Sequence, residues 1–144
     1  MKSWRRNGLT VKMTPLKTEA VDLWNGRRRC HRLLEDFCLI IVSHGLEQRV
    51  QVPKGFDTDF ATIPVFCQMV LGNSDTYAEA ATLHDWLCTT HVPRFICNAW
   101  MRSALFCLGA PMWKQRAFYW GLMLFGYDSP LANAINKLRR KNTK

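Results

Sequence analysis

The chain has 144 residues, of which 48% are hydrophobic and 22% are charged, and its 20 Lys and Arg against 11 Asp and Glu give a formal net charge of +9. This length fits one domain, and the apolar content excludes a disordered chain. A two-domain enzyme with a separate cofactor domain is excluded by length. The charge is uneven, because residues 33–93 hold two bases against eight carboxylates, a balance of −6.

The positive charge lies in the two flanks, which we treat as a basic N-terminal extension over residues 1–32 and a short basic helix or tail over residues 128–144. Such clusters bind nucleic acid or anionic surfaces, or are simply solvated. No apolar segment long enough for a signal peptide follows the basic start, and none is long enough to cross a bilayer. We therefore expect a protein without a signal peptide or a transmembrane segment.

Six cysteines are present, and none are spaced C-x-x-C. Without that spacing or a secretory signal, the pattern favours small core residues in a reducing compartment over a zinc ribbon or a disulfide scaffold. Cys88 and Cys97 flank a predicted turn, so a bridge between them is the alternative.

The first half of the chain predicts strands. Residues 33–42 are rich in β-branched and apolar side chains, Ser43-His44-Gly45 supplies a turn, and residues 46–52 alternate between apolar and polar. Two such runs joined by a short glycine-containing turn predict an antiparallel hairpin. Residues 20–24 predict a further edge strand.

The hydrophobic period then changes to about 3.6, which predicts helices. Pro53 ends the second strand, and residues 55–64 form a loop. We expect helices over about 76–90, with Thr76 and Glu79 as a capping box, then over about 93–108, 112–125 and 131–140. Strands followed by helices predict a single α+β domain, in which three to four helices pack on a small antiparallel sheet.

Titratable side chains cluster in the acidic middle of the chain. Asp57 and Asp59 lie in the loop after the strand, while His84 and Asp85 are adjacent in a helix that is otherwise apolar. A carboxylate among alanines is costly to bury unless it is paired or binds a cation. These four residues are therefore the candidate site.

Two interpretations of this cluster stay open. In the structural one, Asp85 or Asp59 pins the loop to the helix, and His84 is a core histidine. In the functional one, His84 is a general base oriented by Asp59 or Asp85, or Asp57, Asp59 and Asp85 ligate a hard cation such as calcium. No His/Cys cluster has the ligand spacing of a zinc site. His91 contributes only if the helix extends that far.

The motifs VPKGFDTDFATIP at residues 52–64 and YAEAATLHDWL at residues 77–87 resemble the domain-of-unknown-function 1353 family, which is associated with phages and prophages. LGAPMW at residues 108–113 and the Phe125-Gly126 pair fit later elements of that family. The resemblance covers about residues 33–127, the family-like domain. It implies a small bacteriophage protein and establishes no activity.

Two positions depart from the family pattern. Cys88 stands where a tyrosine is usual, and Asn98 stands where an aspartate is usual. The His84-Asp85 helix is also similar to that of phospholipase A enzymes, in which the histidine activates water and the neighbouring aspartate binds calcium. Because the orienting tyrosine and aspartate are replaced here, the resemblance implies a weakened or altered site.

These observations favour a virion or tail-associated protein, or an accessory structural protein, that acts by binding other phage structural proteins, in the virion or the infected bacterial cytoplasm. The first alternative is a His/Asp-dependent hydrolase that helps to penetrate or lyse the host cell, with His84, Asp59 and Asp85 as catalytic residues. The second is a host-takeover factor whose basic termini bind nucleic acid or an acidic host protein.

Overall fold

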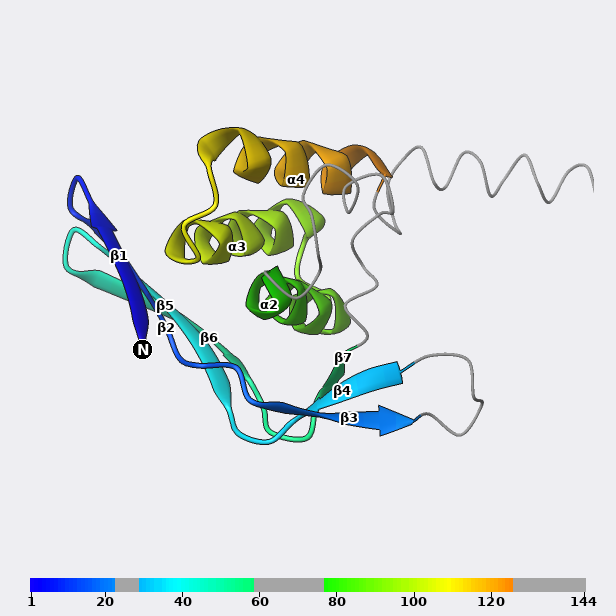
Figure 1. The fold of residues 1–144 in the computed structure, drawn as a ribbon. Helices are drawn as coiled ribbons and strands as arrows, with labels where there is room; N and C mark the ends of the chain where they lie inside the picture. The colour runs from blue at the N-terminus through cyan, green and yellow to red at the C-terminus, as the bar shows by residue number, and fades with distance from the viewer. Residues whose placement is uncertain (23–28, 59–76, 126–144) are drawn as a thin grey trace, which may run out of the picture.

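A computed structural model describes residues 1–22, 29–58 and 77–125. In these ranges the chain forms seven strands followed by three helices, as Figure 1 shows. The α+β fold expected from the sequence is confirmed. The predicted helix over 131–140, the capping residue Thr76 and the loop residues from Asp59 onward lie outside the described residues.

The larger sheet has four antiparallel strands in the order β1-β2-β5-β6. Its strands are β1 (Lys2–Arg6), β2 (Leu9–Met13), β5 (Phe37–Ser43) and β6 (Leu46–Val52). The β5–β6 pair is the predicted hairpin, with Ser43 opposite Leu46 across the His44-Gly45 turn. One face of this hairpin is apolar, as the alternation predicts.

The β1–β2 hairpin was not expected from the sequence, which we treated as a basic extension in this region. Its turn is formed by Asn7 and Gly8, which have φ angles of 48° and 78°. Two consecutive positive φ values define the turn that joins strands most tightly, and Asn-Gly is its preferred dipeptide. Residues 1–13 therefore belong to the sheet.

The smaller sheet has three strands in the order β3-β4-β7, which are β3 (Thr18–Asp22), β4 (Arg29–Leu33) and the short β7 (Asp57–Thr58). β3 lies at the edge of this sheet, where an edge strand over residues 20–24 was expected. β7 pairs with β4 through His31 and Arg32. This pairing places Asp57 and Thr58 of the loop motif beside β4.

The three helices are α2 (Ala78–Thr89), α3 (Arg94–Cys107) and α4 (Met112–Phe125). Their bounds agree with the predicted ones to within two residues. α2 begins after Tyr77, which makes no side-chain capping bond. α3 ends before Gly109, whose φ of 77° and following Pro111 stop the helix.

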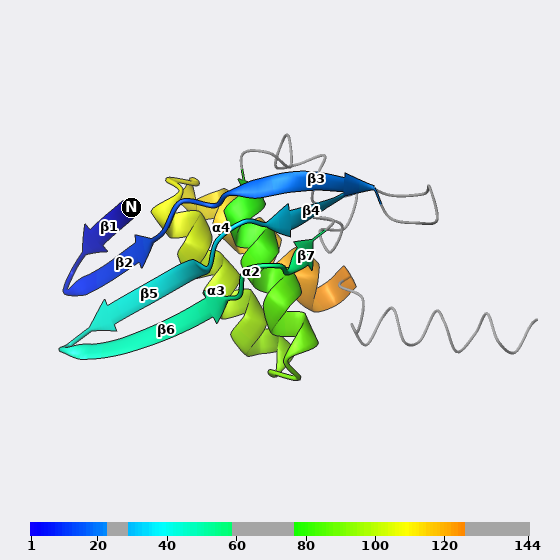
Figure 2. The same ribbon diagram turned by 90° about the horizontal axis from the view of Figure 1, so that it is seen from below.

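The helices form one layer against the sheets, with α2 beside α3 and α3 beside α4 (Figures 1 and 2). The core lies between this layer and the inner faces of β2 and β5. Edge-to-face contact between Phe56 and Trp86, with ring centroids 5.2 Å apart, brings the start of β7 against α2. The largest fully buried apolar side chains are Phe37, Met13, Leu33, Leu39, Leu83, Met101, Leu105 and Leu122.

Candidate functional site

A buried polar pair joins α2 to α3. His84 lies on the inner face of α2 and is 5% exposed, and Asn98 lies on the facing side of α3 and is 1% exposed. His84 Nε2 is 2.8 Å from Asn98 Oδ1. Because the two side chains bond each other, they avoid the full cost of burying polar groups in the core.

This hydrogen bond sets the tautomer of His84. The carbonyl oxygen of Asn98 can only accept, so Nε2 carries the proton and donates it, and Nδ1 keeps its lone pair. Among the described residues, no acceptor lies within hydrogen-bonding distance of Asn98 Nδ2. The pair therefore presents one imidazole nitrogen that can take up a proton.

Burial keeps this imidazole neutral. Removal from water lowers the pKa of His84 below its usual value, and the Arg94 cation lowers it further, while the hydrogen bond to Asn98 opposes the shift. At neutral pH the side chain is thus a base with a free lone pair rather than a cation.

The thiol of Cys88 lies beside the ring. Cys88 is one helical turn after His84, and its Sγ is 3.7 Å from Nδ1 and 4.0 Å from Nε2. The residue as a whole is exposed near the end of α2, but its sulfur is partly buried against the ring. Burial of the thiol raises the pKa of Cys88 to about 12, with further contributions from Cys97 and Asp85. The thiol is therefore protonated at rest.

Asp85 connects the helix to β7. The Thr58 hydroxyl donates to Asp85 Oδ2, and both side chains are buried. This bond joins Thr58, the last described residue of the predicted loop, to the helix, as the structural interpretation of Asp85 expects. Thr58 was not predicted, although its place next to an exposed Asp57 in a strand indicates that it points inward.

Asp57 does not join His84. Its carboxylate accepts two hydrogen bonds from Arg32, at 2.8 Å from Nε and 3.0 Å from Nη2. These hydrogen bonds lower the pKa of Asp57. The side chain lies on the face of β7 opposite Thr58, because neighbouring residues of a strand alternate.

A cation site remains a prediction. Within residues 1–22, 29–58 and 77–125, no three His, Cys, Asp or Glu side chains are grouped closely enough to hold a metal. Asp59, one of the predicted ligands and a predicted orienter of His84, lies outside these ranges. His91 is exposed in the turn after α2, which ends at Thr89, and so lies outside the helix that carries His84.

The five described cysteines form no disulfide bond. Cys30 and Cys97 are buried, Cys38 and Cys107 are half-buried, and Cys88 is exposed. The bridge between Cys88 and Cys97 that was the alternative is not formed, but the two side chains interact, each affecting the pKa of the other.

Residues 31–122 match the family described as "Protein of unknown function (DUF1353)". The chain belongs to this family. The match contains α2, α3 and the loop start, and hence every described residue of the His84 cluster. In this member of the family, the side chains of Cys88 and Asn98, at the two positions that depart from the family pattern, both contact His84.

A curated relative has no assigned activity either. The chain is 31% identical over 100 residues to the uncharacterised protein y4jT of Sinorhizobium fredii. This aligned region covers 64% of this chain and 29% of that protein. The chain therefore spans less than a third of this relative. No solved structure matches the chain. Among the helices that the structure describes, none has the length and hydropathy needed to cross a membrane.

The lowered pKa of His84 predicts a loss of stability in mild acid. Below about pH 6.5 the unfolded chain protonates this histidine and the folded protein does not, so the free energy of unfolding falls by at most about 1.4 kcal/mol per pH unit. The loss stops below the pKa of the folded state. Urea unfolding from about pH 7.5 to about pH 5 measures the slope. An unchanged slope in His84→Gln would contradict the assignment.

Proposed function

We propose that this protein is a hydrolase of esters or amides in which His84 is the general base and the Cys88 thiol is the nucleophile. The observation that carries the proposal is the contact of His84 with both partners, since Asn98 Oδ1 is 2.8 Å from Nε2 and Cys88 Sγ is 3.7 Å from Nδ1 and 4.0 Å from Nε2. A thiol, an imidazole and an orienting amide in this order also serve acyl transfer on unrelated folds.

The chemistry follows from the hydrogen bonds. Nδ1 of His84 takes the thiol proton as sulfur attacks the acyl carbon, and a thioester forms. The imidazolium then gives its proton to the departing alcohol or amine. In the second half-reaction, His84 takes a proton from water as the water oxygen attacks the thioester. The carboxylic acid leaves, and the imidazolium returns its proton to the sulfur of Cys88. The net reaction is addition of water across the ester or amide bond.

The raised pKa of Cys88 determines when the thiol loses its proton. A thiol with a pKa of about 12 is not a resting thiolate, so its proton must be removed during the attack. That requirement makes the rate depend on His84. Asn98 orients the ring but supplies no negative charge, so the imidazolium is supported less than it would be by an aspartate.

The test uses p-nitrophenyl acetate as the probe on the purified full-length chain. We expect release of p-nitrophenol with transient acetylation of Cys88, located by peptide mass spectrometry. Cys88→Ala should lower the rate at least about tenfold. Cys107→Ala is the matched control, because burial also raises the pKa of that half-buried thiol, whereas it donates to the Val11 carbonyl oxygen.

Three outcomes distinguish the possible roles of Cys88 and His84 in hydrolysis. Acetyl-Cys88 that depends on His84 supports the full proposal. Loss of activity in His84→Gln with full activity in Cys88→Ala overturns the thiol step and leaves water as the nucleophile. The hydrolase proposal is overturned if neither variant changes hydrolysis or acetylation. It is also overturned if the parent protein shows neither reaction.

A second candidate function is a virion or tail-associated protein that acts by protein contacts. It is favoured by an apolar stripe on α4, where Trp113, Trp120 and Leu124 are 57%, 59% and 53% exposed. Aromatic side chains are common anchors of protein interfaces. Mass spectrometry of purified virions of a phage that encodes the chain tests this role, which absence of the protein would contradict.

A further inference from the structure

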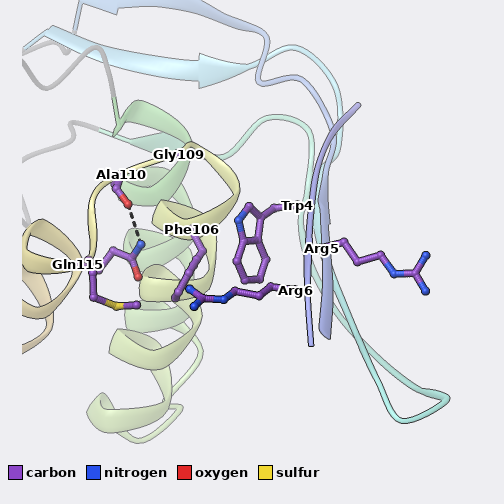
Figure 3. A pocket seen from close by; sticks show the side chains of 8 residues that line it. Trp4, Arg5, Arg6, Phe106, Gly109, Ala110 and Gln115 are labelled. Carbon is purple, nitrogen blue, oxygen red and sulfur yellow. Dashed lines mark hydrogen bonds between the residues drawn. The ribbon is translucent and has the colours of Figure 1, made fainter. Parts of the chain in front are cut away.

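A second polar site lies away from His84, between β1 and the turn that joins α3 to α4. A hollow of about 290 Å³ opens there, close to the lower limit of about 300 Å³ for small-molecule pockets (Figure 3). Trp4 of β1 and Phe106 of α3 pack against each other at its wall, with ring centroids 4.6 Å apart. The hollow therefore offers an aromatic surface to a ligand about the size of one amino acid.

Gln115 of α4 borders the hollow with an unsatisfied acceptor. The side chain is 2% exposed, and its Nε2 donates to the Ala110 carbonyl oxygen at 2.7 Å. No donor within the described residues reaches its Oε1. A buried acceptor left in this state costs about 1–3 kcal/mol, so a ligand with an N–H group is stabilised there.

Arg6 supplies the positive charge. Trp4 and Arg6 lie on the face of β1 toward the helices, whereas the Arg5 side chain points away, as strand alternation requires (Figure 3). In the described part of the chain, neither Arg6 nor Arg102 of α3 has an ion-pair partner. Arg102 Nη2 donates to the weak acceptor Met112 Sδ at 3.8 Å, and no acceptor among the described residues reaches its buried Nε.

We infer that this hollow binds a carboxylate ligand that carries a neighbouring N–H group and an apolar or aromatic side group, as an N-acylated amino acid or the C-terminal residue of a peptide does. The guanidinium of Arg6 pairs with the carboxylate, Gln115 Oε1 accepts from the N–H group, and the side group packs on Trp4 and Phe106. A phosphate group suits the hollow less well, because it offers no N–H group to Gln115 Oε1. Its negative charge is also repelled by that oxygen.

The test is a titration of the ¹⁵N-labelled full-length chain with N-acetyl-tryptophan, followed by NMR. We expect millimolar or tighter binding, with shifts at the Trp4 indole and the Gln115 side-chain amide. Arg6→Gln should weaken binding by at least about tenfold, as for a lost charged hydrogen bond. Lys12→Gln removes a positive charge from an exposed position of β2 outside the residues that line the hollow, and we expect less than about a twofold change.

Two further arms test the ligand chemistry. N-acetyl-tryptophan amide lacks the carboxylate and should bind at least about tenfold more weakly, and Gln115→Met should weaken binding by removing the acceptor. A peptide ending in tryptophan that binds more tightly than N-acetyl-tryptophan identifies a peptide C-terminus, and equal affinity identifies a free small molecule.

Three results would overturn the inference. The first is no shift at Trp4 or Gln115 with about 10 mM N-acetyl-tryptophan, a concentration that detects millimolar binding. The second is an equal effect of Lys12→Gln and Arg6→Gln, which indicates diffuse charge attraction. The third is tighter binding of inorganic phosphate than of the carboxylate.

Discussion

Replacing His84 by glutamine should lower the hydrolysis of p-nitrophenyl acetate at Cys88 by about 10³-fold, within the range for loss of a general base. Glutamine is close to histidine in size and can still donate to Asn98 Oδ1, so the packing of α2 on α3 is largely kept. It cannot accept a proton from the Cys88 thiol. Initial rates of p-nitrophenol release measure the loss, with acetylation mapped to Cys88.

The matched control is His44→Asn. His44 is exposed in the β5–β6 turn with φ at 48°, a conformation that asparagine tolerates well. We expect this variant to keep the parent rate to within about twofold, because it lies on an exposed turn away from the core. Circular dichroism and thermal unfolding separate a lost base from a lost fold. A folded His84→Gln protein with the parent rate would contradict the role of His84.

Replacing Phe37 by alanine should lower the free energy of unfolding by about 3–5 kcal/mol. Phe37 is fully buried at the start of β5, where the sheet meets the helices. Its removal takes a large apolar surface out of the core and leaves a cavity that the surrounding elements fill only in part. Urea unfolding at pH 7 measures the change.

Leu46→Ala is the comparison on the neighbouring strand. Leu46 is 75% exposed at the first position of β6, so we expect a change within about 0.5 kcal/mol. A similar cost for the two substitutions would show that the core does not lie between β5 and the helices. Such a result would also remove the basis for placing α2 and α3 as described.

Much of the fold could be predicted because its signals are local. The His44-Gly45 turn with alternating flanks predicts the β5–β6 hairpin, and Gly109 with Pro111 predicts the end of α3. The β1–β2 hairpin was not predicted, although Asn7-Gly8 is a strong turn signal. Three of the five residues of β1 are charged, which weakens the signal of a strand, and β2 forms because it pairs with β5 far along the chain.

The candidate site could be predicted only in part. Spacing places His84 and Asp85 on one helix, and the family pattern directs attention to Cys88 and Asn98. The bond between His84 and Asn98 depends on how α2 packs on α3, which periodicity does not determine. Thr58 was missed for the same kind of reason, since its contact with Asp85 requires β7 to lie against α2.

The tautomer and the pKa of His84 can be measured without knowing the natural substrate. ¹⁵N NMR of the imidazole, followed against pH, reports which ring nitrogen carries the proton and the pKa at which the ring gains a second one. The structure predicts a proton on Nε2, a bare Nδ1 and a pKa below the usual value of a histidine. A proton on Nδ1, or a pKa above that usual value, would contradict the account.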